Sequence, residues 1–99
     1  MESFTENAIK IIGGIPFGRA MSYKAVATLA GNPRSARTVA RILHSMTAKY
    51  GLPWHRVVDS RGRIAFRDAA AAEEQRRLLE AEGVRLKADG SIEEEFLLR

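Results

Sequence analysis

The chain has 99 residues, of which 45% are hydrophobic, so it is long enough to bury one core and we expect a single domain spanning residues 1–99. It contains no cysteine, which excludes disulfides, thiolate metal sites and a cysteine nucleophile and suits a reducing cytoplasm. Apolar runs are far shorter than the roughly 18 residues that a membrane-spanning helix needs, and no leader pattern is present. A soluble, cytoplasmic protein is expected, associated with the nucleoid if the source is bacterial.

The net charge of +4 is unevenly distributed along the chain. Residues 1–67 carry eleven Lys or Arg side chains against three acidic ones, whereas residues 68–99 carry five against nine. Because basic surfaces attract polyanions, the first two-thirds favour a nucleic acid partner. The alternative is an ordinary solvated basic surface.

The first helix is predicted from a capping motif near the start of the chain. Ser3 and Glu6 have the spacing of a capping box, in which each side chain accepts a hydrogen bond from the backbone N–H of the other residue. Apolar residues at helical spacing follow, and Gly13-Gly14 is expected to end the helix.

A helix-turn-helix motif is predicted over about residues 22–43. Ser22 is a suitable N-cap for a helix over 23–30. Asn32 and Pro33 favour the start of the next helix, with asparagine as the cap and proline at the first helical position. Two helices joined by a short glycine-containing turn are typical of this motif.

The second helix of the motif separates its basic and apolar side chains onto two faces. At about 100° per residue, Arg34, Arg37 and Arg41 share one side. Solvated helices usually alternate acidic and basic residues, whereas no carboxylate occurs between residues 33 and 58. The residues expected to contact DNA here are Arg34, Ser35, Arg37, Thr38 and Arg41.

Residues 44–58 are predicted to form a loop that lines a pocket. The stretch 44–52 has little periodicity and leads into Pro53-Trp54-His55-Arg56-Val57-Val58. Trp54 offers a flat apolar face with one N–H donor, and His55 and Arg56 need polar partners if they are buried. Trp54 is interpreted either as a pocket wall or as an ordinary core tryptophan.

Residues 57–66 are predicted to form a β-hairpin wing, because two short β-prone runs flank the turn-forming sequence Asp-Ser-Arg-Gly. A further helix is predicted over 69–82, followed by a weaker hairpin or extended segment around Asp89-Gly90 and an acidic tail from Glu93. The predicted fold class is mostly α with a short β-hairpin wing, as in a winged helix-turn-helix domain.

Four motifs in a fixed order connect the chain to a known family. They closely resemble the DNA-binding domain of the O6-alkylguanine-DNA alkyltransferases, over about residues 4–85: Pro16-Phe17-Gly18, Ser22-Tyr23, Gly31-Asn32-Pro33-Arg34-Ser35-Ala36-Arg37 and Pro53-Trp54-His55-Arg56-Val57-Val58. The enzymes accept the alkyl group on the cysteine of a Pro-Cys-His-Arg-Val motif, and here Trp54 stands at that position. An indole is a very poor alkyl acceptor compared with a thiolate. The chain therefore resembles the alkyltransferase-like proteins, which bind the same lesions without repairing them.

The resemblance implies roles for individual residues. Arg37 resembles the arginine finger that fills the gap left by the extruded base, and Tyr23 resembles the tyrosine that presses on the neighbouring phosphate. Trp54 and Arg67 correspond to residues around the flipped base, and Tyr23 and Val57 are expected to complete this lesion pocket.

The resemblance also implies a network without a nucleophile. His55, Arg56 and Glu82 match the enzymes' pattern, and with no thiol to activate they are expected to form a structural hydrogen-bond network. Met46 stands where the enzymes carry an asparagine that braces the turn before the pocket. This departure implies a more adaptable or larger pocket.

The implied function is a non-enzymatic damage sensor with no catalytic residues, metal or cofactor. It would bind O6-alkylguanine in double-stranded DNA from the minor groove as a monomer, flip the nucleotide, and flag it for nucleotide excision repair proteins, with no membrane partner. One alternative is a sequence-specific winged-helix transcriptional regulator. The other is an enzyme, either an alkyltransferase with an unusual acceptor or a hydrolase that uses His55 and Glu82.

Overall fold

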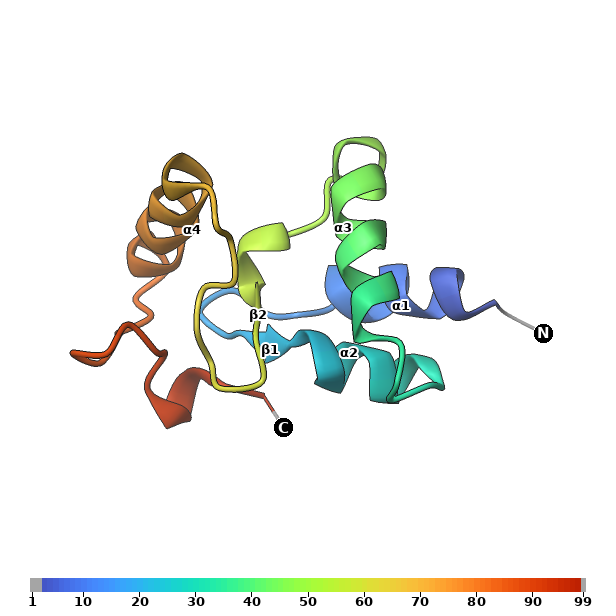
Figure 1. The fold of residues 1–99 in the computed structure, drawn as a ribbon, viewed down its shortest axis with the longest axis horizontal. Helices are drawn as coiled ribbons and strands as arrows, with labels where there is room; N and C mark the ends of the chain where they lie inside the picture. Colours follow the sequence, from blue (N-terminus) through green and yellow to red (C-terminus); the bar gives the residue numbers. More distant parts are fainter. Residues whose placement is uncertain (1–2, 99) are drawn as a thin grey trace.

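Helices dominate the computed structural model, which describes residues 3–98 of the chain. The four helices are α1 (Phe4–Gly13), α2 (Tyr23–Ala30), α3 (Ala36–Tyr50) and α4 (Ala69–Ala81). The shorter elements are β1 (Met21–Ser22), β2 (Val57–Val58) and two 3-10 helices, η1 (Trp54–Arg56) and η2 (Glu94–Phe96). Helices α1, α2 and α3 form one end of the molecule, α4 forms the other, and the strands lie between them (Figure 1). The predicted mostly α fold class is confirmed. Within residues 3–98, no helix has the length and apolar character that crossing a membrane requires.

The capping box of α1 is confirmed. The Ser3 side chain accepts a hydrogen bond from Glu6 N at 3.1 Å, and Glu6 Oε1 accepts one from Ser3 N at 3.3 Å. At the other end, the N–H of Gly14 donates to the carbonyl of Lys10 at 3.0 Å. These bonds satisfy backbone groups that a helix end would otherwise leave unpaired.

The start of α3 differs from the prediction. The helix begins at Ala36, with Ser35 as N-cap, and not at Pro33. The Asn32 side chain accepts a hydrogen bond from Arg34 N at 3.0 Å, which forms a local turn where a helix start was expected. A five-residue connection therefore separates α2 from α3.

The predicted loop over residues 44–52 is wrong, because α3 continues to Tyr50. No glycine or proline interrupts residues 44–50, so nothing in the sequence stops the helix before Gly51, which has φ +61°. Met46 accordingly lies inside α3 and packs against the core, and does not sit in a turn. The pocket segment, which carries Trp54, therefore comprises only residues 52–58.

The β1–β2 pair lies between two hydrophobic cores. The strands are parallel, with Met21 beside Val57 and Ser22 beside Val58. Successive strand residues point to opposite faces, so Val57 enters the core of α1, α2 and α3 while Val58 enters a second core with Leu79 and Ile92. Both valines are fully buried.

The predicted hairpin wing over residues 57–66 is also wrong. Its first strand, β2, pairs with β1, and residues 63–66 form no strand; the backbone bond from Asp59 N to the Arg63 carbonyl at 2.9 Å closes a turn and does not extend into a strand ladder. The Asp59 carboxylate accepts hydrogen bonds from Arg61 N and Arg63 N, both at 2.8 Å, and closes a tight turn. The second predicted hairpin is present as an antiparallel bridge between Leu86 and Ile92.

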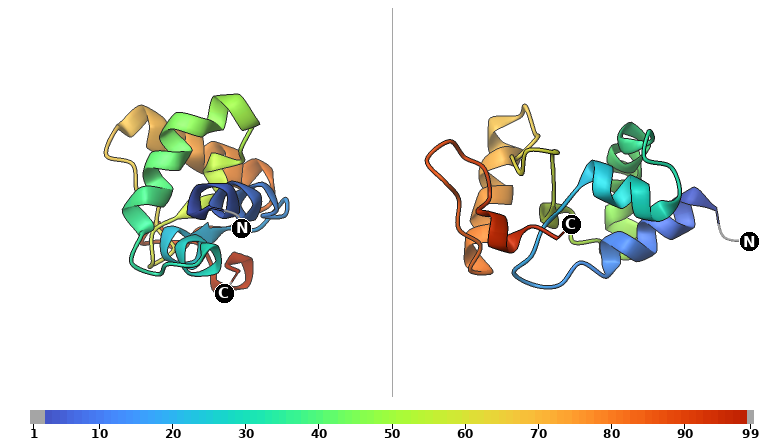
Figure 2. Two further views of the ribbon diagram at one scale, coloured as in Figure 1. Left: turned by 90° about the vertical axis from the view of Figure 1, so that its right-hand side faces the viewer. Right: turned by 90° about the horizontal axis from the view of Figure 1, so that it is seen from below.

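The acidic C-terminal segment packs against the rest of the fold. Leu97 bridges Ala20 in parallel, and Leu98 N donates to the Ala20 carbonyl at 2.8 Å. The segment thereby returns to the middle of the long axis of the molecule (Figure 2, right). Arg85 binds Glu93 at 3.0 Å and Glu95 at 2.6 Å, so this part of the acidic charge is already paired.

Candidate nucleic-acid interface

Trp54 lines a cavity at the junction of three helices. The residue is half-buried in η1, and its ring packs partly against the main core. The cavity has a volume of about 460 Å³, within the range of small-molecule sites. Its lining comes from α2, α3, α4 and the segments between them: Tyr23, Ala40, Leu43, His44, Thr47, Trp54, Phe66 and Ala71. The structure therefore brings Tyr23 and Trp54 together on one cavity.

Phe66 forms an aromatic corner with Trp54. The two ring centroids lie 5.5 Å apart and the planes meet at 85°. Sequence reasoning placed Phe66 in the second strand of a wing and missed its part in the cavity. A large aromatic next to the predicted Arg67 was the only available signal.

Two residues predicted for the lesion pocket do not line this cavity. Val57 is fully buried in the main core and does not line this cavity, so its part in a lesion pocket stays a prediction. Arg67 is exposed and lies outside the cavity lining, next to Phe66. Contact between Arg67 and a flipped base stays a prediction.

The predicted DNA-binding residues lie at the start of α3 and on its outer face. Arg34 is exposed in the turn, Ser35 is the N-cap, and Thr38 is half-buried. Arg37 and Arg41 are exposed, and within residues 3–98 neither has a carboxylate at ion-pair distance. The side chains of Arg37 and Arg41 are therefore available to bind a ligand.

The basic face of α3 borders the cavity. At about 100° per residue, His44 falls beside Arg37 and Arg41 on the helix surface and also belongs to the cavity wall. Sequence reasoning did not single out His44, because it placed residue 44 in a loop. A polyanion bound along α3 would therefore lie next to the opening beside Trp54.

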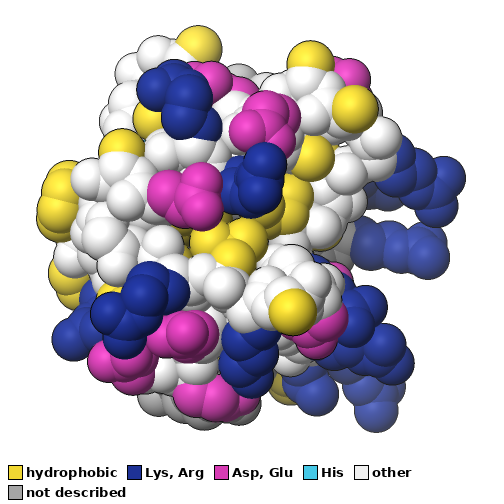
Figure 3. All heavy atoms as spheres, turned by 90° about the vertical axis from the view of Figure 1, so that its left-hand side faces the viewer, with side chains coloured by type: hydrophobic (Ala, Val, Ile, Leu, Met, Phe, Trp, Pro, Cys, Tyr) yellow, Lys and Arg dark blue, Asp and Glu magenta, His cyan; other side chains and the backbone are white. Residues whose placement is uncertain are grey.

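The charges of α4 are arranged differently. Arg76 binds Glu73 at 2.9 Å and Arg77 binds Glu74 at 2.6 Å, each within one helical turn. Figure 3 shows basic and acidic side chains interspersed over the face formed by α4 and the C-terminal hairpin, with further Lys and Arg side chains projecting beyond one edge. Of these two helices, α3 therefore carries the basic charge that no carboxylate among residues 3–98 compensates.

His55, Arg56 and Glu82 form one hydrogen-bond network. His55 Nε2 lies 2.6 Å from Glu82 Oε2, and Arg56 reaches the same carboxylate through Nη2 at 2.8 Å and Nε at 2.9 Å. Gly18 N also donates to Glu82 at 2.8 Å, and Arg56 Nη1 donates to the Ile15 carbonyl at 2.8 Å. The network joins η1, α4 and the loop after α1.

The network holds Glu82 as a carboxylate. Burial by itself would raise the pKa of Glu82, but hydrogen bonds from Arg56, Gly18 N and His55 outweigh it and lower the pKa to about 2. A carboxylate can only accept, so His55 Nε2 is the donor. The Nε2–H group of His55 is therefore occupied by its hydrogen bond to Glu82.

Gln75 is a further member of the site that sequence reasoning missed. Its fully buried side chain donates from Nε2 to the carbonyls of His55 at 3.0 Å and Val57 at 2.9 Å. These bonds fix the backbone on both sides of Arg56. The signal in the sequence was its spacing of four residues from the buried Leu79, which places both on one face of α4.

Tyr23 presents a neutral phenol to the cavity. Burial raises the pKa of Tyr23, and the nearby Asp59 carboxylate raises it further. The hydroxyl is therefore protonated at neutral pH and can donate a hydrogen bond to a phosphate oxygen without charge repulsion.

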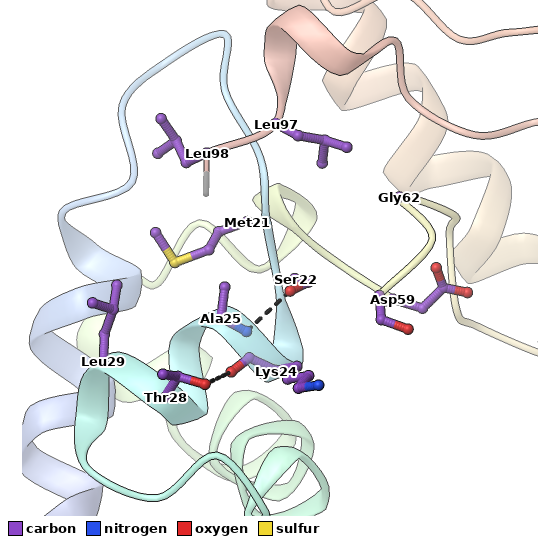
Figure 4. Close-up of a pocket in the computed structure, with 11 residues that line it drawn as sticks. Met21, Ser22, Lys24, Ala25, Thr28, Leu29, Asp59, Gly62, Leu97 and Leu98 are labelled. Carbon is purple, nitrogen blue, oxygen red and sulfur yellow. Dashed lines mark hydrogen bonds between the residues drawn. The ribbon is translucent and has the colours of Figure 1, made fainter.

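A second hollow is formed by the other face of α2, the turn after β2 and the C-terminal segment. Met21, Leu29 and Leu98 supply apolar surface, and Ser22 and Lys24 lie at its margin (Figure 4). None of the residues predicted to contact DNA or the lesion lines it. The candidate interface is therefore the cavity beside α3.

Comparison with known proteins identifies the family. The model of the family described as "6-O-methylguanine DNA methyltransferase, DNA binding domain" matches residues 3–84. An Escherichia coli K12 protein named DNA base-flipping protein is 39% identical over 92 residues, which cover 93% of this chain and 70% of that protein. Alkyltransferase-like protein 1 of Schizosaccharomyces pombe is 36% identical over 87 residues, which cover 87% of this chain and 81% of that protein.

The fold comparison agrees with the sequence comparison. The crystal structure of S. pombe Atl1 in complex with damaged DNA containing O6-carboxymethylguanine matches with a TM-score of 0.82 and 30% identity, covering 100% of this chain and 99% of that chain. The predicted likeness to the DNA-binding domain of the alkyltransferases is thus confirmed for both sequence and fold. The chain belongs to the family of the 6-O-methylguanine DNA methyltransferase DNA-binding domain, and its relatives there include DNA base-flipping and alkyltransferase-like proteins.

Proposed function

We propose that this chain binds O6-alkylguanine in duplex DNA, flips the modified nucleotide into the cavity beside Trp54, and leaves it unrepaired. The observation that carries this proposal is the position of the Trp54 cavity next to the unpaired basic face of α3. The names of the relatives, which include base flipping and a complex with damaged DNA, support it.

Binding begins with the charges of α3. Arg34 and Arg41 contact phosphates and supply affinity that falls with salt. Arg37, on the same face, enters the duplex from the minor-groove side, where its planar guanidinium stacks in the gap left by the extruded base. Tyr23 presses on the adjacent phosphate with its neutral hydroxyl.

Discrimination comes from the cost of flipping and from the cavity. Extruding a base costs a few kcal/mol, and less when the base is modified and pairs badly. Burial of the alkyl group among the apolar wall residues adds about 0.8 kcal/mol per methylene. We assign Arg67, which is exposed next to Phe66, contact with the flipped base through a hydrogen bond or a cation–π contact.

In this proposal the chain is not an enzyme. Transfer of an alkyl group from guanine needs a soft, activated nucleophile, and the chain has no cysteine. We place Trp54 at the position of the alkyl acceptor, where it supplies a stacking surface. His55, Arg56 and Glu82 then act as a structural support for the pocket segment.

A lesion that is bound and not reversed has to be passed on. We propose nucleotide excision repair proteins as the recipients, with this chain acting as a monomer. The exposed face of α4, where Arg76 pairs with Glu73 and Arg77 with Glu74, carries none of the residues proposed to contact DNA, so we propose it as the surface that a second protein approaches.

Competition binding tests the proposal against a sequence-specific regulator. Two duplexes of one sequence differ only by a single O6-methylguanine, and each competes with a labelled damaged duplex. The proposal expects the damaged duplex to compete at lower concentration whatever the flanking sequence. Equal competition, or tight binding to one undamaged sequence, would show that the chain is not a lesion sensor.

The enzymatic alternatives are tested on the same complex after prolonged incubation. Intact-protein mass spectrometry detects a transferred methyl group, and chromatography of the digested DNA detects restored guanine. The proposal expects an unchanged protein mass and unchanged O6-methylguanine. Either product would establish an enzyme.

A further inference from the structure

Phe66 stands out among the aromatic residues because it is 41% exposed and yet has a defined aromatic partner. It belongs to neither hydrophobic core. Its ring lines the cavity at right angles to Trp54, with centroids 5.5 Å apart. The exposed surface of the ring therefore adds little to the stability of the fold and is available to a ligand.

Two local structures fix the position of Phe66. On one side, the Asp59 carboxylate closes the turn that starts its segment. On the other, the Asp68 side chain accepts a hydrogen bond from Ala70 N at 3.2 Å and caps α4. The ring is thus presented from a short segment held at both ends, and the small side chain of Ala71 leaves space beside it.

The arrangement suits a third aromatic ring. Aromatic rings prefer offset-stacked or edge-to-face contacts with centroids about 4.5–7 Å apart, and two walls at right angles can offer both kinds at once. A methyl group offers little contact area to either ring and has no π-system to stack. A substituent that carries a ring, such as benzyl, can fill the corner between them.

We propose that Phe66 is a specificity-determining residue, which together with Trp54 makes the cavity favour O6-substituents that contain an aromatic ring. This inference rests on the proposed function, since it takes the cavity to be the lesion pocket. It concerns the choice among lesions and not the recognition of damage itself.

The test compares dissociation constants for three duplexes of one sequence that contain guanine, O6-methylguanine or O6-benzylguanine at one position. The proteins are the wild type, Phe66→Ala, Phe66→Leu and the control Leu29→Ala, whose side chain is exposed on the other face of α2. Circular dichroism and thermal unfolding check that each variant folds.

We expect the wild type to bind the benzyl lesion more tightly than the methyl lesion. Phe66→Ala should weaken benzyl binding by about fivefold and methyl binding by less than about twofold, because the benzyl ring makes an aromatic contact with Phe66 that a methyl group cannot make. Phe66→Leu, which keeps apolar volume without the ring, should show most of the same loss. Leu29→Ala should keep the wild-type ratio.

The outcomes separate this inference from the function on which it rests. Equal wild-type affinity for all three duplexes would overturn the proposed function and this inference with it. A wild-type preference for both lesions over guanine, with a benzyl-to-methyl ratio that Phe66→Ala leaves unchanged, would overturn the role of Phe66 alone.

Discussion

His55 Nε2 and Glu82 Oε2 lie 2.6 Å apart, which joins the pocket segment directly to the end of α4. Arg56 and the backbone of Gly18 bind the same carboxylate, so Glu82 holds three segments that are distant in sequence. Because the network is complete without a nucleophile, its energetic effect should be visible in the stability of the protein.

Stability should therefore depend on pH through Glu82. The pKa of this carboxyl falls from its ordinary 4.5 to about 2 on folding, so its contribution is fully present above about pH 4.5 and is lost as the pH falls towards 2. The shift corresponds to about 3 kcal/mol. Urea unfolding of the wild type and Glu82→Gln should show a gap of this order at pH 7 that narrows steadily below pH 5. A gap that is the same at pH 7 and pH 3 would contradict the assignment.

Arg37 and Arg41 should have different effects although they share a face. Arg37→Ala should abolish the preference for damaged duplex, because no side chain then fills the gap left by the base. Arg41→Ala should weaken damaged and undamaged duplexes alike and reduce the slope of log affinity against log salt by about 1. Fluorescence anisotropy over a range of salt concentrations measures both effects. Normal discrimination by Arg37→Ala would remove its role as the finger.

Gln75 should stabilise the pocket segment from inside α4. Gln75→Leu leaves the buried carbonyls of His55 and Val57 without this donor, and we expect a loss of about 2 kcal/mol in the free energy of unfolding. The buried Oε1 of Gln75 has no hydrogen-bond partner within residues 3–98, and its removal offsets part of this cost. The neighbouring control Arg76→Gln, on the exposed face, should change stability by less than about 0.5 kcal/mol. Similar losses in the free energy of unfolding for Gln75→Leu and Arg76→Gln would contradict the role of Gln75 in stabilising the pocket segment.

Tyr23 should titrate above pH 10. Burial and then the Asp59 carboxylate raise the pKa of Tyr23, so its phenolate absorbance should develop late in an alkaline titration. Comparison of the wild type with Tyr23→Phe isolates this component, and Asp59→Asn should move it to lower pH. A component lost in Tyr23→Phe that titrates at or below pH 10 would show that the side chain is not held as described.

Local signals in the sequence predicted the start of the fold well. Ser3 and Glu6 form their capping box, and Ser22 caps α2 through the N–H of Ala25, because both interactions span only three residues. The last turns of α3 were missed because residues 44–50 have no clear apolar period, although no stop signal precedes Gly51. Val57-Val58 were read as a wing strand, since a sequence does not reveal that their partner is Met21-Ser22, far away in the chain.

In the candidate site too, local sequence patterns predicted some features, and the features that depend on tertiary contacts were missed. The motif around Trp54 directed attention to the correct segment, and Tyr23 lies on the same cavity. Phe66 and Gln75 were missed because their contribution depends on where the segment after β2 and the helix α4 pack against η1. Such tertiary contacts leave little trace in the local pattern.

The central claim is that a modified guanine enters the cavity beside Trp54, and the fluorescence of Trp54 tests it most directly. Trp54 is the single tryptophan of the chain, so the signal needs no label and has one source. A base stacked on the indole should quench it. Titration with a duplex carrying one O6-methylguanine should quench the fluorescence until one protein is bound per lesion, whereas the undamaged duplex, at concentrations where anisotropy shows full binding, should leave it nearly unchanged. Equal quenching by both fully bound duplexes would contradict selective flipping into this cavity.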